Sequence, residues 1–463
     1  MSVFRRSVCR AGHGTRRLAM ALTAAGLLAA CGGGDGGRET VAPPTSCSVA
    51  DHQQWLGNYM NDWYFWYRLS PHPDAAAYAD VESYFEALLY TGIDPAFPAD
   101  RWSRSESTES FNRFYGEGST LGYGVSVAGL EVEGQPGAPL YVRHVEPLSP
   151  AAVQDVQRGD EVLAMNGRSA YDLIAADDFS ALTADSVGET LTLDLWRGGV
   201  QRTVSLSAAV FTLTPVGGTA VLTTAAGRRL GYVTVKDMIG QALAPLETAF
   251  SRFRAEGVQD VVLDLRYNGG GLVSTGGTLA SYVAGTRGSG RRYATLLYND
   301  KRSDNNQSFG FSALTSALSL PRVFVLMGRR TCSASEQVVN GLRGVGVEVV
   351  AIGETSCGKP VGSLPTSTCD RTYSVINFES VNERNEGRYF DGFDATCDVA
   401  EDFTSVQGSP ADPLLAAASH FADSGNCPVP AAATATRKQA LGARATRRPA
   451  IVEGGERTAM IPR

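Results

Sequence analysis

The chain has 463 residues, of which 43% are hydrophobic and 19% are charged, a composition typical of globular domains rather than of disordered or multi-spanning membrane proteins. At about 150 residues per domain this length predicts about three domains, and it excludes a small scaffold that depends on disulfides. The formal net charge is −7; because a nucleic-acid-coating protein needs basic residues to neutralise phosphates, we expect no nucleic-acid partner.

Residues 1–30 have the pattern of an export signal. Arginines dominate the first 17 residues, and an apolar run of 13 residues follows from Leu18 to Ala30, which is too short to span a bilayer. The run ends in Leu-Ala-Ala before Cys31 and so resembles a bacterial lipobox, which implies cleavage before Cys31 and a lipid on its thiol. An ordinary secretory signal with an incidental Cys31 is the alternative.

This signal predicts a bacterial cell-envelope protein, anchored in the membrane through a lipid at Cys31. Gly32 resembles an outer-membrane sorting residue, so we expect the chain at the outer membrane, facing the periplasm or the exterior. Residues 31–47 are rich in Gly and Pro and predict a tether.

Export also predicts disulfides. Beyond Cys9 and Cys31, six cysteines remain, and six allow fifteen pairings. These are Cys47, Cys332, Cys357, Cys369, Cys397 and Cys427. We favour a bond between Cys357 and Cys369, because their spacing suits a strand-loop-strand closure. Histidine is scarce and no Cys-x-x-Cys pair occurs, so we expect no metal site.

Residues 48–118 have a helical pattern. Apolar side chains from Val81 to Leu89 recur at helical spacing, and Asp80 is placed to cap such a helix. The aromatic run 63–67 indicates a small helical core, with a ligand platform as the alternative.

Residues 119–208 have a period of two, typical of short strands. Within them Leu121, Gly122, Tyr123 and Gly124 resemble the loop of a PDZ domain that holds a terminal carboxylate, and 149–163 resembles the middle of that domain. The resemblance implies a peptide that adds as a strand while backbone N–H groups bind its carboxylate. A small β-domain without a ligand is the alternative.

Residues 209–427 alternate between strands and helices and predict an α/β layer. The segment 428–463 has no apolar period and carries seven basic against two acidic residues. We predict that it is disordered.

Three segments of this α/β layer contain the candidate reactive groups: 264–271, 331–336 and 353–359. Each follows a predicted strand. Because the carboxyl ends of strands in an open α/β sheet meet at one edge, the three loops are expected to form one crevice.

Ser333 begins a predicted helix and has two explanations. With Glu336 three residues later it forms the pattern of a capping box. A serine at a helix start also lies beside free N–H groups, which suits a nucleophile that generates an oxyanion. The glycines 269–271 have two explanations as well. They form a tight turn, or they let backbone N–H groups approach the oxyanion of a tetrahedral intermediate without obstruction by side chains.

A nucleophilic serine needs a base, and none of the five histidines lies in these loops. Lys359 is a candidate base if burial lowers its pKa enough to populate the neutral amine. A solvated turn is the alternative reading of Gly-Lys-Pro at 358–360.

The chain resembles the C-terminal processing (tail-specific) peptidases. The resemblance lies in the sequence from Asp264 to Gly271, the Ser-Ala-Ser-Glu run at 333–336 and Lys359, which all follow a PDZ-like region. The resemblance covers roughly 50–425. It implies a multidomain α+β fold with a helical N-terminal region, a PDZ-like β-rich domain and a crotonase-like α/β catalytic core.

The same resemblance implies a role for each matching residue. Ser333 is the nucleophile and Lys359 the general base. Glu336 is a supporting carboxylate, and the N–H groups of Ala334 and of Gly270 or Gly271 form the oxyanion hole. Ser335 is the rival nucleophile. The chain departs from many family members at Ser363, where a Gln that orients the lysine is common.

The function expected from this resemblance is proteolysis of unfolded or flexible polypeptides, with no metal or cofactor. The alternatives are an inactive relative that only holds peptides or lipids, and an esterase.

Overall fold

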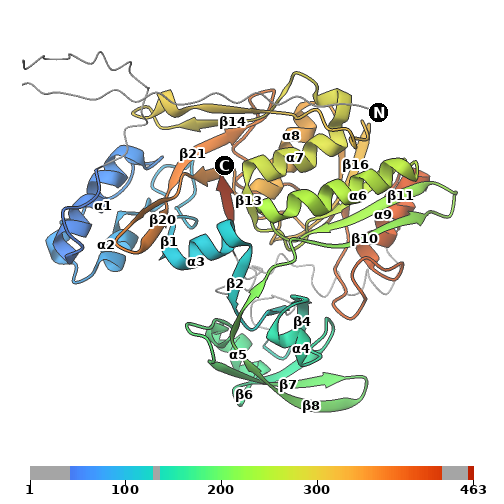
Figure 1. Cartoon of the computed structure of the whole chain (residues 1–463), viewed down its shortest axis with the longest axis horizontal. Helices are drawn as coiled ribbons and strands as arrows, with labels where there is room; N and C mark the ends of the chain where they lie inside the picture. Colours follow the sequence, from blue (N-terminus) through green and yellow to red (C-terminus); the bar gives the residue numbers. More distant parts are fainter. Residues whose placement is uncertain (1–41, 129–135, 430–456, 463) are drawn as a thin grey trace, which may run out of the picture. The chain divides into compact units, whose positions relative to one another are not determined.

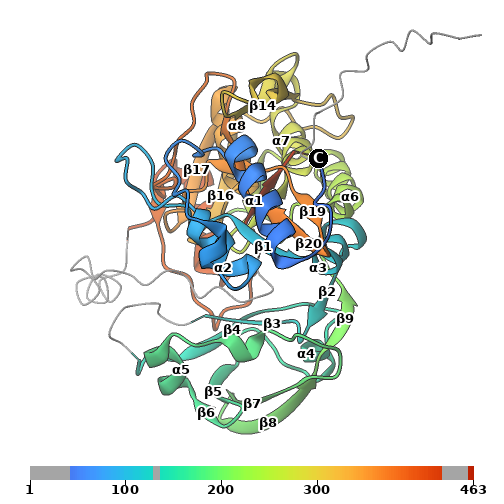
Figure 2. The same cartoon turned by 90° about the vertical axis from the view of Figure 1, so that its left-hand side faces the viewer.

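The computed structural model describes residues 42–128, 136–429 and 457–462. The predicted signal, Cys31 and most of the tether lie outside these residues. Three regions follow one another along the described chain: a helical one, a β-rich one and an α/β one (Figures 1 and 2). Among the described helices, none has the length and apolarity needed to cross a membrane.

The helical region consists of α1 (Val49–Trp63), α2 (Val81–Leu88) and α3 (Thr108–Asn112). Asp80 caps α2 as predicted, since its Oδ1 accepts a hydrogen bond of 2.8 Å from the N–H of Ser83. Most of the aromatic run at 63–67 is buried, as a structural role predicts, but in the main hydrophobic core shared with the α/β region and not in a separate small helical core.

The helical pattern does not extend through residue 118. Strand β1 (Arg104–Ser107) interrupts it and pairs antiparallel with β20 (Arg371–Ser374), which in turn pairs with β19 (Thr366–Thr368). The pairing partners are far away in the sequence, so local periodicity did not indicate them.

The β-rich region is built on a six-stranded antiparallel sheet. Its strands are β3 (Val125–Ala128), β4 (Leu140–Val145), β5 (Glu161–Met165), β6 (Arg168–Ser169), β7 (Thr190–Arg197) and β8 (Val200–Ser207). Two short helices accompany it, α4 (Pro150–Val153) and α5 (Ala170–Ala176). The alternation at 191, 193 and 195 is confirmed, because all three leucines are buried in the core of this region.

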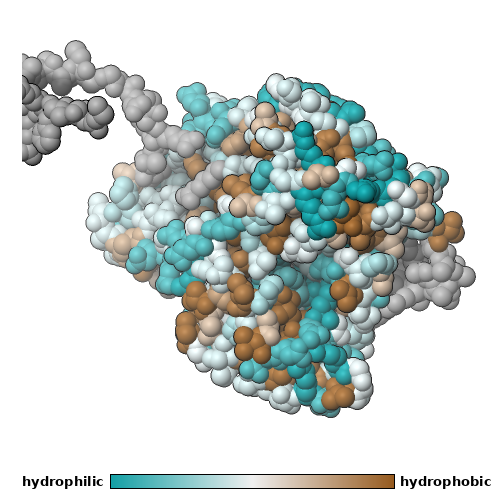
Figure 3. All heavy atoms as spheres, turned by 45° about the vertical axis from the view of Figure 1, so that its right-hand side comes forward, coloured by the Kyte–Doolittle hydropathy of each residue, from teal (hydrophilic) through white to brown (hydrophobic). Residues whose placement is uncertain are grey.

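One edge of this sheet is formed by β3. Strand β3 is hydrogen-bonded only to β4 in the sheet order of the described strands, so its other side is an edge. Strand β2 (Ser119–Gly122) precedes it and pairs with β9 (Ala209–Thr212). The lower part of Figure 3 shows hydrophobic side chains in several places among hydrophilic ones, and Leu148, Val153 and Tyr171 are exposed in this region.

The α/β region contains a second six-stranded sheet, which is parallel apart from its first pair. In spatial order its strands are β10 (Val216–Thr223), β11 (Arg229–Val235), β12 (Asp260–Asp264), β16 (Arg322–Met327), β17 (Glu348–Gly353) and β22 (Cys397–Asp398). Both faces are covered, which explains the continuous apolar runs of the central strands.

Two separate cores lie on the two faces of this sheet. On one face side chains such as Val261 and Leu263 pack with α6 (Leu243–Ala255), α7 (Val273–Ala284) and α8 (Ala334–Gly344). On the other face side chains such as Val262 pack against α9 (Pro413–Ser424). Alternate residues of one strand therefore belong to different cores.

Two smaller sheets complete the α/β region. The first contains β15 (Gln307–Gly310), β14 (Arg292–Tyr298), β21 (Ile376–Val381) and β18 (Val361–Ser363). The second is a parallel pair of β13 (Gly270–Leu272) and β23 (Ala459–Ile461). Figure 1 shows the dark red β23 beside β13.

Strand β23 corrects the prediction of a disordered segment at its far end. Most of 428–463 lies outside the described residues, but 457–462 is ordered, and Met460 is completely buried. Three residues are too few to produce a periodic signal, and their partner is the glycine strand at 270–272.

The disulfide prediction was wrong. Cys357 is bonded to Cys332 and not to Cys369, which pairs with Cys47; the third bond joins Cys397 and Cys427. The fold brings the Cα atoms of Cys332 and Cys357 to 5.2 Å, a distance suited to a disulfide, whereas spacing along the chain carries no information on such long-range contacts.

Candidate active site

The three strand-end loops meet at one edge of the parallel sheet, as their positions after β12, β16 and β17 predict. Backbone hydrogen bonds connect them. The N–H of Cys332 donates to the carbonyl of Asn268 at 3.0 Å, and the N–H of Cys357 donates to the carbonyl of Thr331 at 3.1 Å. Each loop is thus held by its neighbour.

Ser333 lies at the start of α8 with an unusual backbone. Its φ is 61° and its ψ is −115°, a conformation that costs a non-glycine residue free energy. The residue is completely buried. Its N–H donates to Oε2 of Glu336 at 2.9 Å, whereas its Oγ has no hydrogen-bond partner among the described residues. The arrangement of the predicted capping box is therefore present, although the hydroxyl makes no hydrogen bond of normal geometry.

Ser335, the rival serine, is in a different situation. Its Oγ donates a hydrogen bond of 3.1 Å to the carbonyl of Asn268. Its hydroxyl therefore has a structural partner, in contrast to that of Ser333.

Glu336 holds the loops of Ser333 and Lys359 together. Its Oε2 accepts from the N–H of Ser333 at 2.9 Å and from the N–H of Lys359 at 2.8 Å. Its Oε1 accepts from the N–H of Gly358 at 2.8 Å and from Oγ of Ser356 at 2.6 Å. Burial raises the pKa of the Glu336 carboxyl, and these hydrogen bonds oppose the rise.

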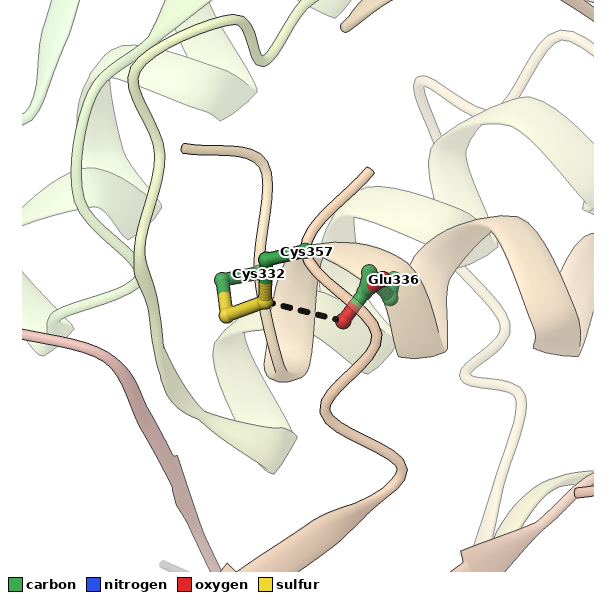
Figure 4. A group of neighbouring side chains, drawn as sticks. All are labelled: Cys332, Glu336 and Cys357. Atoms are coloured by element: carbon green, nitrogen blue, oxygen red, sulfur yellow. Dashed lines mark hydrogen bonds between the residues drawn. A yellow bond between two sulfur atoms is a disulfide. The ribbon is translucent and has the colours of Figure 1, made fainter. Parts of the chain in front are cut away.

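The disulfide between Cys332 and Cys357 is a second connection between the same loops. Figure 4 shows it beside Glu336, with Sγ of Cys357 at 3.6 Å from Oε2. A disulfide sulfur carries no proton, so we interpret this approach as packing. The three side chains lie close enough to ligate a metal, but the two sulfurs are bonded to each other and not available as thiolates.

Lys359 is a buried amine with a lowered pKa. Burial lowers its pKa well below the ordinary lysine value, and the positive charge of Arg104 lowers it further, against opposing effects of Asp100 and Glu336. Its Nζ donates a hydrogen bond of 2.7 Å to the backbone carbonyl of Thr458. The environment thus favours the neutral amine, as a base requires.

Ser363, in the position of the frequent Gln, is a buried residue of β18 that pairs with Ile376. Among the described hydrogen bonds, that of the Lys359 amine is made with the segment around Thr458 and not with Ser363.

The glycine turn approaches the same place with its backbone. Gly270 has a φ of 103°, and a Cβ there would lie 2.8 Å from the N atom of Ala334 and 2.3 Å from the carbonyl oxygen of Ala459. Only glycine leaves this space free. The N–H of Gly270 is already donated to Oδ1 of Asn268 at 2.8 Å, so Gly271 is the candidate of the two for a ligand-facing donor.

The predicted carboxylate loop lies in the β-rich region, between β2 and β3. Leu121 and Gly122 end β2, and Tyr123 is buried. Gly124 has a φ of 74°, and a Cβ there would lie 2.0 Å from Cβ of Ser149. A separate hollow of about 480 Å³ in this region is lined by β4, β5 and the beginning of α5, and by none of these four residues.

Two contributors to the site were missed in the sequence. Arg104 lies in β1 and, like Lys359, donates to the carbonyl of Thr458 at 2.7 Å. Neither Arg104 nor Thr458 belongs to a motif, and both are remote in sequence from the three loops. A signal for them exists only in the tertiary structure.

Comparison with known families accounts for the three regions in the order found. The model of the peptidase S41 N-terminal domain matches residues 51–104, the PDZ domain model matches 117–196, and the model of peptidase family S41 matches 229–392.

Curated relatives give the same assignment. The chain is 28% identical over 247 residues to the chloroplastic C-terminal processing peptidase of Tetradesmus obliquus, covering 51% of each chain. It is 26% identical over 215 residues to the carboxyl-terminal-processing protease of a Picosynechococcus strain, covering 46% of this chain and 49% of the relative. The chain thus spans about half the length of the curated relatives that it matches.

The fold is shared with a crystal structure from Bacteroides fragilis that carries the name S41 protease, at a TM-score of 0.62 and 24% identity, over 80% of this chain and 96% of that one. The chain therefore contains, in this order, a peptidase S41 N-terminal domain, a PDZ domain and a peptidase family S41 domain.

Proposed function

We propose that the chain is a serine endopeptidase in which Ser333 is the nucleophile and Lys359 the general base. The observation that carries the proposal is the shared hydrogen bonding of Glu336, whose Oε2 accepts from the N–H groups of both residues. The hydroxyl of Ser333 is buried and has no hydrogen-bond partner among the described residues, and the amine of Lys359 is buried and has a lowered pKa. The loops that carry these two groups are both bound to the carboxylate of Glu336.

The reaction begins with proton transfer from the Ser333 hydroxyl to the neutral Lys359 amine while Oγ attacks the substrate carbonyl carbon. The protonated lysine then returns a proton to the leaving amine as the C–N bond breaks. A water molecule hydrolyses the resulting acyl-enzyme with the same base. A lysine of ordinary pKa would be protonated at neutral pH, so the burial of Lys359 is a requirement of this step.

The negative charge on the substrate oxygen needs donors in place before the reaction. The N–H of Ala334, at the start of α8, and that of Gly271 supply them in this proposal. Gly270 provides the open space that lets the substrate carbonyl approach.

The substrate class is an unfolded or flexible polypeptide whose C-terminus is captured by the PDZ domain. The edge strand β3 and the loop 121–124 before it provide the features that strand addition and carboxylate capture need. The exposed apolar side chains of that domain favour contact with unfolded chains.

We also propose that the enzyme acts in the bacterial cell envelope, attached to the outer membrane through a lipid on Cys31. Three disulfides in the described structure support an oxidising compartment. Replacement of Cys31 by Ser, followed by membrane fractionation and mass spectrometry of the N-terminal peptide, tests the anchor. Retention of the unmodified variant in membranes would contradict it.

The catalytic proposal is tested with protein that begins at Ala42, which retains the disulfide of Cys47, and an unstructured polypeptide, whose fragments are identified by mass spectrometry between pH 6 and pH 10. We expect Ser333→Ala and Lys359→Ala to abolish cleavage. Activity of the unchanged protein should rise with pH as Lys359 loses its proton.

Two matched variants serve as controls. Ser335→Ala removes the neighbouring hydroxyl, and Lys301→Met removes a lysine that binds the backbone of Asn61; both should still cleave. Cleavage by Lys359→Ala would refute the assigned base. Turnover of a small ester without any polypeptide fragments would favour an esterase, and peptide binding without either activity would favour an inactive relative.

A further inference from the structure

The segment Arg457–Pro462 lies along the candidate active site as an added strand. Its residues Ala459, Met460 and Ile461 pair in parallel with the glycine strand, Ala459 opposite Gly270. The N–H of Ala459 donates to the carbonyl of Gly269 at 3.0 Å. The segment thus uses the backbone groups next to the proposed oxyanion hole.

Polar contacts from neighbouring side chains hold the beginning of this segment. Lys359 Nζ and Arg104 Nη1 each donate 2.7 Å hydrogen bonds to the carbonyl oxygen of Thr458. The guanidinium of Arg457 binds Oε2 of Glu106 at 2.7 Å and Oγ of Ser110 at 2.6 Å. The proposed base is therefore bonded to the segment, while the hydroxyl of Ser333 is unengaged.

Apolar contacts hold the remainder. Ala459, Met460 and Ile461 are 3%, 0% and 1% exposed. Met460 enters the main core, whereas Ala459 and Ile461 pack in a cluster that includes Phe111 and Leu272. Three consecutive buried residues indicate a groove with pockets on both sides of the strand.

The carbonyl of Ala459 faces the reactive centre. A Cβ built on Gly270 would lie 2.3 Å from this oxygen and 2.8 Å from the N atom of Ala334. The carbonyl oxygen and the N–H that begins the nucleophile's helix therefore border the same small space. A peptide substrate of the proposed enzyme has to place its reacting carbonyl there.

We propose that residues 457–462 are an attached occupant of the substrate groove, which competes with other polypeptides for it. The inference rests on the proposed function for the identity of the groove as a substrate site. An attached ligand competes without a loss of translational freedom, so a free peptide has to exceed a high effective concentration. The groove accordingly takes extended peptides with a small residue followed by two apolar ones.

The test measures binding and requires no cleavage. A fluorescent heptapeptide with the sequence of 457–463 is titrated into two forms of the Ser333→Ala protein, one with its complete sequence and one that ends at Glu456. We expect the shortened form to bind the peptide roughly 10- to 100-fold more tightly, because its groove is vacant. A control peptide with Ala459→Asp and Met460→Asp should bind at least about tenfold more weakly, because the pockets are apolar.

A second variant guards against unfolding of the shortened form. Met460→Asp in the full chain retains the length but places a carboxylate in the core, so it should also release the segment and bind the heptapeptide. Hydrogen exchange of the full Ser333→Ala chain gives a third measurement: excess heptapeptide should accelerate exchange at the amide of Ala459, and the control peptide should not.

Equal affinity of the complete and shortened forms for the heptapeptide would overturn the inference, as would unchanged exchange at Ala459 under excess heptapeptide. Peptide binding by the shortened form together with an absence of proteolysis in the unaltered protein would refute the proposed function and leave the occupied groove intact. Proteolysis by the unaltered protein, together with equal peptide affinity of the complete and shortened forms, would support the proposed function and overturn the inference of an occupied groove.

Discussion

At the scale of residues, the backbone of Ser333 stands out. Its φ of 61° lies in the region that favours glycine, in a residue that has no room to relax. Such conformations cost about 1–3 kcal/mol and persist only where the surroundings impose them. Here α8 begins directly after Ser333, and Cys332 directly before it is held by a disulfide.

This strain predicts opposite effects of glycine at two neighbouring serines. Ser333→Gly should be more stable than Ser333→Ala by about 1 kcal/mol, because glycine tolerates the conformation. Ser335→Gly should be less stable than Ser335→Ala by about 1 kcal/mol, because Ser335 lies within α8. Denaturant midpoints of the four variants check the prediction, and the same order at both positions would contradict it.

Arg104 sets the charge around the proposed base. Its positive charge disfavours protonation of Lys359, so its removal should raise the pKa of the lysine. For Arg104→Gln we expect the ascending limb of the kcat/KM profile, which reports deprotonation of Lys359, to move to higher pH. The sign follows because the base acts in its neutral form, which then appears only at higher pH.

Arg101→Gln is the matched control for this pH profile. Arg101 stacks over the ring of Trp102, has the same charge and is not among the groups that shift the pKa of Lys359. An equal shift in both variants would assign the effect to overall charge, and an unmoved limb in Arg104→Gln would contradict the prediction.

At the scale of elements, two loops are joined twice. The disulfide between Cys332 and Cys357 and the carboxylate of Glu336 both connect the start of α8 to the loop after β17. One connection is covalent and lies on the chain just before the proposed nucleophile, so its loss should affect catalysis as well as stability.

The disulfide between Cys397 and Cys427 offers a comparison of similar loop size, since its sequence separation is 30 against 25. Replacing either pair by Ser should lower the free energy of unfolding by about 3 kcal/mol. Only the Cys332 and Cys357 double variant should also lose kcat. Thermal unfolding and peptidase assays separate the two effects, and a matching loss of kcat in both double variants would refute the special role.

The sequence was sufficient to predict which loops form the site. The strand-end positions of Ser333 and Lys359 follow from hydrophobic runs and from parallel-sheet topology, and both side chains lie where these indicate. Glu336 was correctly placed near them, but its partners are backbone N–H groups, which sequence does not specify. The disulfides and the role of Arg104 depend on contacts between distant segments.

At the scale of the whole molecule, short strands inside regions predicted to be helical or disordered were the hardest features to predict. Residues 104–107 read as part of a helical region and 459–461 as part of a disordered one, yet both are strands. Each is short and obtains its stability from a partner elsewhere, β20 and β13 respectively. Periodicity works on long elements with a complete face, such as β7, and fails on three or four residues.

Substitution of a glycine in the loop 121–124 tests whether the PDZ domain supports cleavage by the catalytic domain. Gly124→Ala places a Cβ against Ser149 at a positive φ, whereas a Cβ on Gly122 meets open space. We expect Gly124→Ala to lower kcat/KM at least about tenfold for long polypeptides with a free C-terminus, because the loop loses its shape. Short peptides should be cleaved as before.

Gly116→Ala, which adds a Cβ in open space outside the loop, should leave both classes of substrate unaffected. Equal losses on long and short substrates in Gly124→Ala would show that the substitution damages the catalytic domain and would contradict a role in capture.

The bond between Cys47 and Cys369 joins residues 322 positions apart, from the beginning of α1 to the turn between β19 and β20. It is a covalent shortcut past the helical region, the PDZ domain and most of the catalytic domain. A pulling force applied on the N-terminal side of Cys47 therefore passes directly to Cys369 and bypasses the residues between. Single-molecule extension before and after reduction would show the released contour as a step of up to about 1,100 Å, at roughly 3.4 Å per residue.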